Sequence, residues 1–484
     1  MNFVLVALFA LLFQESVPSS ATAWSFSIGS WAPQREARSH RALTDKQKEL
    51  IHSVAQQARE IILALPGEEQ KNQLCGSLAA IFAESGDLAA AREIASSIRS
   101  DDARMEALHA IADAQAGNGD FASALDTATS IKGESNRSRA IVDVISAQAD
   151  VKDFAGALQS AGKVADQPAA YTRALVEIAD REASANQKSE ALALLGKALE
   201  SASSITTCYE GIESCRSALL SQIAIAQLHA GNAKAAQETL DLAQQGLSQA
   251  SQEEQFVSTA EIAAAEQEMG HPERAKELLS SIPDTAGQFA ETMSAMRQVS
   301  EAATKGDMAS VQSAVDSISS PEQRGMAQLI MAQAYAQSGD AKSALDALRA
   351  LKPLSLRAQF AGSVAQSLAD KGKFGEAEEA LKIGMSAAET EENDRAIAEL
   401  LSAGVQVCAS AGDAQGAREK AEMIKDRETR AAAARAAAKT LASKKKDEEV
   451  LKWSAAEASG FVKANILLGA AEGIASQETE NSKK

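Results

Sequence analysis

The chain has 484 residues, a formal net charge of −18, 45% apolar residues and only 4% aromatic residues. This length exceeds one ordinary core, and the alanine-rich composition with sparse β-branched residues predicts an all-α fold of several domains or repeats. The negative charge repels phosphate backbones and anionic lipid, so we expect no nucleic-acid partner.

The first element is an apolar run from Phe3 to Phe13, followed by polar residues that end in Ala21-Thr22-Ala23. This layout is typical of a secretory signal peptide cleaved before Trp24, and the run is too short to span a bilayer comfortably. No Lys or Arg precedes the run, which leaves an uncleaved anchor or a misassigned start open. We expect a signal peptide over residues 1–23, export to the periplasm or outside the cell, and no stable membrane insertion after cleavage.

Residues 24–43 show no helical period and are interpreted as a flexible linker, and residues 476–484 as a polar tail. An internal repeat fills residues 44–475. Its turn recurs at eleven places, which we call the turn positions: Gly86, Gly119, Lys152, Asn186, Gly231, Gly270, Gly306, Gly339, Gly372, Gly412 and Lys445. Successive turn positions lie 33 to 45 residues apart, which predicts about eleven helix-turn-helix repeats.

Each repeated residue has a physical role. Glycine, at eight of the eleven turn positions, can adopt the left-handed conformation that ends a first helix. Asp or Asn next to the turn position suits the N-cap of the second helix, as at Asp87, Asp120, Asp153, Asn232, Asp307, Asp340 and Asp413. Alanine or valine stands five positions after every turn position, and alanine recurs seven before it, which indicates two closely packed backbones.

These residues resemble the tetratricopeptide repeat family, most closely at Gly119-Asp120-Phe121 with Ala112 and Ala124. The resemblance implies a right-handed superhelical solenoid whose first helices line a concave groove that binds proteins or peptides. The tryptophan near the start of the family's first helix and the proline at its repeat end are missing here. A sister class of α-solenoid therefore stays open.

Two further patterns concern the junctions and ends of the repeat array. An arginine recurs fifteen positions before the turn position, as at Arg104, Arg137, Arg216, Arg324, Arg357 and Arg430. It could form a basic ladder for an anionic ligand, or a salt bridge or carbonyl cap that joins neighbouring hairpins. The amphipathic segment Thr44–Leu65 should cover the open N-terminal end of the array, and Gly460–Ile474 the C-terminal end.

The sequence contains no recognisable catalytic, metal-binding or nucleotide-binding motif. The five histidines have no zinc-ligand spacing, and no phosphate loop, nucleophile elbow or dinucleotide fingerprint occurs. We therefore predict a non-catalytic protein without a cofactor or metal. Cys208 and Cys215 could form a disulfide across a small loop, unless a continuous helix holds them about 10 Å apart. Cys75 and Cys408 are interpreted as buried small residues rather than reactive thiols.

Candidate partner-binding residues follow from the family's groove positions, thirteen, ten, six and three before the turn position. These positions hold Met293, Met296, Ser300 and Ala303 in one repeat, Met326, Leu329, Gln333 and Ala336 in the next, and Gln366 beyond. Methionine is flexible and polarisable and suits a surface that accepts varied apolar side chains. The alternative is that these methionines fill the core between hairpins.

The sequence thus favours an exported scaffold that binds an unidentified protein or peptide. An envelope-assembly or polysaccharide-handling solenoid is the alternative, although Trp24, Trp31 and Trp453 do not fall in one groove as sugar platforms would. RNA binding is opposed by the charge and by the signal peptide.

Overall fold

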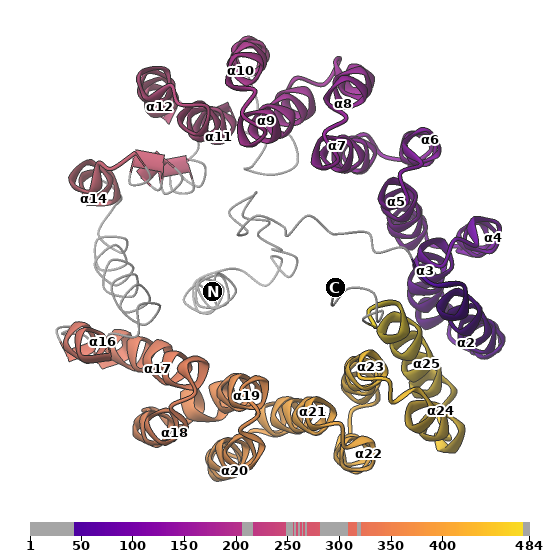
Figure 1. The fold of residues 1–484 in the computed structure, drawn as a ribbon. Helices are drawn as coiled ribbons and strands as arrows, with labels where there is room; N and C mark the ends of the chain where they lie inside the picture. Colours follow the sequence, from indigo (N-terminus) through magenta and orange to yellow (C-terminus); the bar gives the residue numbers. More distant parts are fainter. Residues whose placement is uncertain are drawn as a thin grey trace. The chain divides into compact units, whose positions relative to one another are not determined.

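A computed structural model describes residues 43–205, 216–247, 269–280, 308–316 and 321–477, with single positions between 255 and 266. All regular secondary structure in this part of the chain is helical (Figure 1). The helices up to residue 205 are α2 (Asp45–Leu63), α3 (Glu68–Glu84), α4 (Leu88–Ser97), α5 (Asp101–Gly117), α6 (Phe121–Thr129), α7 (Glu134–Asp150), α8 (Phe154–Ala161), the 3-10 helix η1 (Gly162–Val164), α9 (Pro168–Ser184) and α10 (Lys188–Ser203).

The helices beyond residue 215 follow the same alternation of first and second helices wherever both members of a hairpin are described. They are α11 (Arg216–His229), α12 (Ala233–Gly246), α14 (Pro272–Ser280), α16 (Met308–Asp316), α17 (Pro321–Ser338), α18 (Ala341–Ala350), α19 (Leu354–Asp370), α20 (Phe374–Thr390), α21 (Asp394–Ala411), α22 (Ala414–Met423), α23 (Arg427–Ser443), α24 (Asp447–Ala456) and α25 (Gly460–Ala475). The predicted all-α solenoid of helical hairpins is confirmed.

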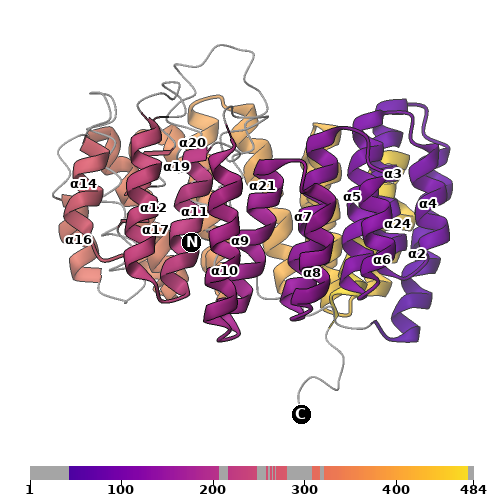
Figure 2. The same cartoon turned by 90° about the horizontal axis from the view of Figure 1, so that it is seen from above.

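The chain divides into two compact units. Within the described residues, unit 1 comprises Ala116–Phe121 and Arg137–Leu278, and unit 2 comprises Leu43–Gln115, Ala122–Asn136 and the residues that follow Leu279. Unit 1 therefore holds α8 to α14, and unit 2 holds α2 to α4 together with α16 to α25. Within each unit the helices run side by side along their length (Figure 2).

The turn that ends each first helix has the predicted left-handed backbone. All ten turn positions within the described residues have φ between 62° and 91°, including the non-glycine residues Lys152, Asn186 and Lys445. The eleventh, Gly306, lies outside the described residues. Because glycine takes this conformation without strain, its frequency at these positions has a direct structural cause.

Second helices begin at the predicted caps. A side-chain oxygen accepts a hydrogen bond of 2.9–3.2 Å from the backbone N–H three residues ahead at Asp87, Asp153, Asn232, Asp340 and Asp413. Each such cap stabilises a helix by about 1 kcal/mol. Glycine and cap together set the direction in which the chain reverses.

The small residues lie where first and second helices meet. Alanines five positions after the turn position are fully buried, namely Ala91, Ala124, Ala157, Ala191, Ala236, Ala344, Ala377 and Ala417. So are the alanines seven before it at Ala79, Ala112, Ala179, Ala332 and Ala365. First helices contact the first helices of adjacent hairpins, as α9 contacts α11 and α19 contacts α21. They lie along one side of each unit, here named the first-helix face (Figure 1).

The two helices expected to cap opposite ends of the array pack against each other, inside unit 2. α25 and α2 contact each other as extensively as the two helices of an ordinary hairpin, and α25 also contacts α23 and α3. Ala58 stands 33 positions before Ala91, and Ala471 stands 33 after Ala438; all four are buried. α25 thus takes the place of a first helix and α2 that of its second helix. We call this pair the composite hairpin. The expectation of two separate covers was wrong, because each helix buries its apolar face on the other.

Glycines let α25 approach α23 closely. A Cβ atom on Gly469 would lie 2.2 Å from the backbone oxygen of Arg435, and one on Gly473 would lie 2.3 Å from that of Lys439. A real Cβ atom cannot come so near to a backbone oxygen, so both positions require glycine. The spacing of four residues places both on one face of α25.

Candidate functional site

The first-helix face carries a recurring polar residue six positions before the turn position, which we call the rung residue. In unit 2 it is a glutamine in three successive first helices, α17, α19 and α21. Gln333 donates to Ser367 at 2.5 Å, Gln366 to Ser410 at 3.3 Å, and Gln406 to Thr440 at 2.6 Å. Each bond reaches the next first helix, so side chains connect α17, α19, α21 and α23 into one row.

The row continues into the composite hairpin. Arg435 of α23 pairs with Glu472 of α25 and donates to Ser77 of α3 at 3.0 Å, while the Lys439 ammonium lies 3.6 Å from Glu472. Five first helices from the C-terminal part of the chain (α17, α19, α21, α23 and α25) and one from its N-terminal part (α3) are therefore joined on the same face. Such inter-helix bonds fix the register of the exposed side chains between them.

The remaining oxygen of each glutamine is buried. Oε1 of Gln333, Gln366 and Gln406 is shielded from solvent and accepts no hydrogen bond. An unsatisfied buried oxygen carries a desolvation penalty of about 1–3 kcal/mol. The glutamines therefore connect helices rather than offer free carbonyl groups to a ligand.

The first helices of unit 1 are joined by a row of their own, which consists mainly of charged side chains. Ser146 of α7 donates to Glu177 of α9 at 3.0 Å, and Arg181 of α9 pairs with Asp150 of α7 at 3.0 Å. Asp180 of α9 lies 2.8 Å from Nδ1 of His229 on α11. That hydrogen bond is the main reason why the pKa of Asp180 is lowered.

Exposed side chains stand between the rungs of unit 2. Gln359 of α19 and Glu399 of α21 lie seven positions before Gln366 and Gln406, which places them on the same side of each helix. Both are exposed. A partner on the first-helix face would touch these positions, and we take them as representative exposed residues of that face.

The predicted groove residues do not all lie on the first-helix face. Leu329 is not on the surface: it is 2% exposed within the apolar cluster around Leu348 and Leu368, so its place in the groove was wrong. Gln333 and Gln366 do lie on the first-helix face, where they bind neighbouring helices. Met293, Met296, Ser300 and Ala303 lie outside the described residues, as does the side chain of Met326.

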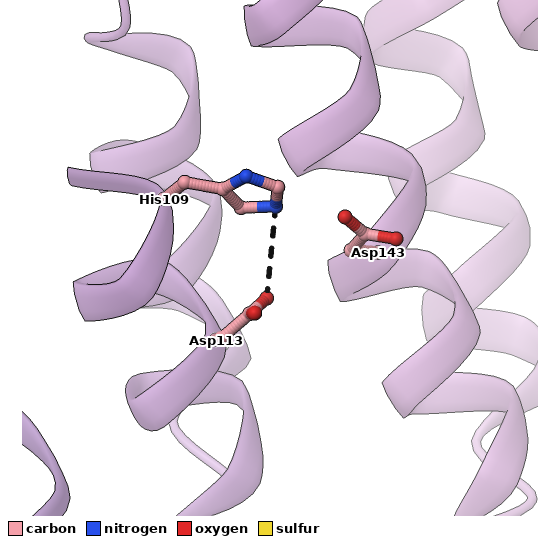
Figure 3. A group of neighbouring side chains, drawn as sticks. All are labelled: His109, Asp113 and Asp143. Atoms are coloured by element: carbon pink, nitrogen blue, oxygen red, sulfur yellow. Dashed lines mark ion pairs between the residues drawn. The ribbon is translucent and has the colours of Figure 1, made fainter. Parts of the chain in front are cut away.

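A histidine and an aspartate pair on α5. Nε2 of His109 lies 3.9 Å from Oδ1 of Asp113, one helical turn away (Figure 3). Asp143, drawn in the same view, is on α7 in unit 1, whereas the pair belongs to unit 2. A pair of this spacing stabilises a helix when the imidazole is protonated.

Buried polar pairs inside the hairpins were missed by the sequence analysis. A glutamine four positions before the turn bonds a hydroxyl twelve residues later at 2.7–2.8 Å in three hairpins, namely Gln115–Thr127, Gln148–Ser160 and Gln227–Thr239. In α9 the equivalent residue is Glu182, whose Oε2 is buried without a partner. A spacing of twelve between Gln and Thr or Ser would have revealed these pairs.

The recurring arginine acts at the junction between hairpins. Arg104 donates to the carbonyl oxygen of Ile98 at 2.8 Å, and Arg357 to that of Leu351 at 3.0 Å. Both carbonyl groups close a preceding second helix. At these two residues the carbonyl-cap interpretation describes the structure. Each guanidinium group donates to a backbone carbonyl oxygen at the junction rather than forming part of a basic ladder.

The cysteines divide into two sets. Cys75 and Cys408 are buried free thiols, and burial is the main cause that raises the pKa of each. A raised thiol pKa lowers reactivity, as expected for structural residues. Cys208 and Cys215, the predicted disulfide, lie outside the described residues.

Comparison with solved structures finds matches over most of this chain, all at low identity and low TM-score. Ton1535 from Thermococcus onnurineus NA1 is 16% identical over 81% of this chain and 97% of its own, with a TM-score of 0.23. The structure of Naa15/Naa10 bound to HypK-THB is 15% identical over 86% of this chain and 70% of its own, with a TM-score of 0.26. A circular tandem repeat protein with novel repeat topology is 12% identical over 86% of this chain and 95% of its own, with a TM-score of 0.16. These TM-scores are too low to carry an argument about function.

No protein-family model and no curated protein match the chain. Among the described helices, none combines the length and apolar character needed to cross a membrane. The class of the molecule therefore rests on its own structure, a helical repeat protein.

Proposed function

We propose that this chain is an exported, non-catalytic scaffold that binds a protein or peptide partner along its first-helix face. The observation that carries the proposal is the side-chain row that joins α17, α19, α21 and α23. It holds successive helices in one register, so that exposed residues such as Gln359 and Glu399 repeat at regular intervals. Regular spacing over several hairpins suits an extended or helical segment of another protein.

The tetratricopeptide resemblance supports the same face, since that family binds its partners along first helices. Export rests on the apolar run and small-residue site before Trp24, which lie outside the described residues. The alternative is an envelope-assembly or polysaccharide-handling role, which would use the same face for a different ligand.

A photo-crosslinking amino acid at chosen positions tests the proposal. Placed at Gln359 or Glu399, it should capture a protein partner when the mature chain is incubated with envelope extract. The matched controls are Glu379 on α20 and Glu422 on α22, which are also exposed but belong to second helices. Equal capture from both sets, or capture from the controls alone, would refute a partner on the first-helix face. Retention on isolated cell-wall polysaccharide without protein adducts would favour the alternative.

Export has its own measurement. Fractionation of the producing cells should place the protein outside the cytoplasm, and the mature N-terminus should begin at Trp24. A cytoplasmic protein that retains Met1 would overturn the export proposal and leave the scaffold proposal standing.

A further inference from the structure

The composite hairpin differs from every other described hairpin in its connection. Elsewhere a short turn joins first and second helix, whereas here no turn connects α25 to α2. Thr44 caps the start of α2, and Nε2 of Gln47 reaches the carbonyl oxygens of Ile474 at 3.0 Å and Gln477 at 3.4 Å. The end of α25 and the start of α2 therefore lie where the other hairpins have their turn.

The interface between α2 and α25 is apolar, and its side chains are shielded from solvent. On α2, Ile51, Val54, Ala55, Ala58 and Ile62 are all at most 1% exposed. On α25, twelve of sixteen residues are buried, and their burial is shared between the contacts of α25 with α2, α23, α24 and α3. Separation of α2 from α25 would expose a continuous apolar surface on each helix, and such surfaces usually mark an interaction site.

The two surfaces are also different from each other. Each chain has one α2 and one α25, so one copy can offer its α2 to the α25 of another and still have its own α25 free. This is the geometry of a heterologous contact, which forms dimers, rings or open chains by repetition. Among the described helices, α2 is the one that fills the place of a second helix beside α25.

We propose that the α2–α25 interface, formed within one chain here, is also the contact through which a second copy of this chain binds. The internal contact is favoured in dilute solution because its partner is covalently tethered. Opening of the composite hairpin lets α2 of one copy complete the last hairpin of another. The same residues and the same Gln47 hydrogen bonds then form between chains.

Paired cysteines can trap either form of the contact. A Cβ atom on Gly460 would lie 3.7 Å from Cγ2 of Ile61, so cysteine side chains at these two positions would be in contact across the interface. The double variant Ile61→Cys/Gly460→Cys, with Cys208 and Cys215 replaced by Ser, should close within one chain under mild oxidation. Failure to close would contradict the interface itself.

The decisive experiment mixes two single variants. A chain with Ile61→Cys and one tag, and a chain with Gly460→Cys and another tag, should form a disulfide-linked pair that grows with time and concentration. Val151→Cys, 63% exposed on unit 1, replaces Ile61→Cys in the control, which should give about tenfold less mixed product. Equal yields, or no mixed disulfide at all, would overturn the proposal.

A measurement without new cysteines guards against misfolded variants. Wild-type chains with two tags are mixed in mild denaturant, returned to buffer and purified on one tag. The second tag should co-purify, and it should be lost when both chains carry the closed Ile61→Cys/Gly460→Cys disulfide. Co-purification that survives this closure would show that another surface is responsible.

Discussion

The side-chain amide of Gln47 donates a 3.0 Å hydrogen bond to the backbone oxygen of Ile474, although 427 positions separate the two residues. Carbonyl groups at the end of a helix often need a partner from outside the helix. Here that partner comes from the first turn of α2. The composite hairpin is therefore secured by a specific polar contact as well as by its apolar surface.

Removal of that amide should weaken unit 2. Gln47→Ala removes the hydrogen bonds to the carbonyl oxygens of Ile474 and Gln477 and the acceptor for the Thr44 N–H, and each such bond is worth about 0.5–1.5 kcal/mol. We expect a lower melting temperature by calorimetry and faster amide exchange in α2 and α25. Lys48→Ala, on the exposed side of α2, is the matched control and should leave both unchanged. If the two variants behave alike, these bonds contribute nothing measurable.

Glycine at position 469 should be irreplaceable. Gly469→Ala places a methyl group against the Arg435 backbone oxygen and forces α25 away from α23, at a cost of about 1–3 kcal/mol or more. Gly460→Ala meets only ordinary contacts, at 3.5 Å or more, and should be neutral or stabilising. Chemical denaturation of both variants measures the difference. Equal stability would mean that α25 is not packed as described.

The small-residue positions can be tested inside one helix. Ala438 and Ala432 both belong to α23, but Ala438 is fully buried seven positions before the turn, and Ala432 is exposed. Leucine at 438 should overpack the contact with α25 and cost about 1–3 kcal/mol. Leucine at 432 should be tolerated, since leucine and alanine are both good helix formers. A tolerated Ala438→Leu would contradict the assignment of repeat positions.

Glu182 should make the stability of unit 1 depend on pH. Burial, with a smaller effect of Glu190, raises the pKa of this carboxyl in the folded chain above its ordinary value. The folded state then holds the proton more tightly than the unfolded state. Between the two pKa values the free energy of unfolding falls as pH rises, and above the folded pKa the penalty is fully present.

Glu182→Gln should remove this dependence. We expect the variant to be more stable than the parent near neutral pH and to show a flatter profile above the ordinary glutamate pKa. Urea denaturation at several pH values provides the measurement, with the exposed Glu200→Gln as control. Asp180 acts in the opposite direction: its pKa is lowered, so its stabilisation is lost only as pH falls through that lowered value. A parent profile as flat as that of Glu182→Gln would disprove the assignment.

Local features of the fold were predictable because they repeat. The left-handed turn, the Asp or Asn cap and the buried alanines recur at fixed offsets, and one chain offers up to eleven examples of each. Even Lys152, Asn186 and Lys445 could be recognised, since they stand where the other repeats have glycine. Periodicity replaced the information that related sequences would have given.

Features that join distant parts of the chain were not predictable in this way. Thr44–Leu65 and Gly460–Ile474 were recognised as amphipathic or apolar, but amphipathicity does not say what covers a helix. Ala58 stands one repeat length, 33 residues, before Ala91, which is the buried alanine of a second helix. This spacing marks α2 as a second helix that has no first helix directly before it in the sequence. Leu329 was misplaced because the family's groove positions were carried over, whereas here this position faces the core. The inter-helix bonds of Gln333 and Gln366 depend on which hairpins become neighbours.

The composite hairpin also bears on where this fold could begin and end. Because Gln477 and Thr44 occupy the ends of an absent turn, a short glycine-containing linker between them would turn the last hairpin into an ordinary one. The chain could then be cut at another turn, such as the one at Gly372, without the loss of any described hairpin. In such a circular permutant α2 would follow α25 directly, and α20 and α19 would become the pair of helices that joins the two ends of the sequence.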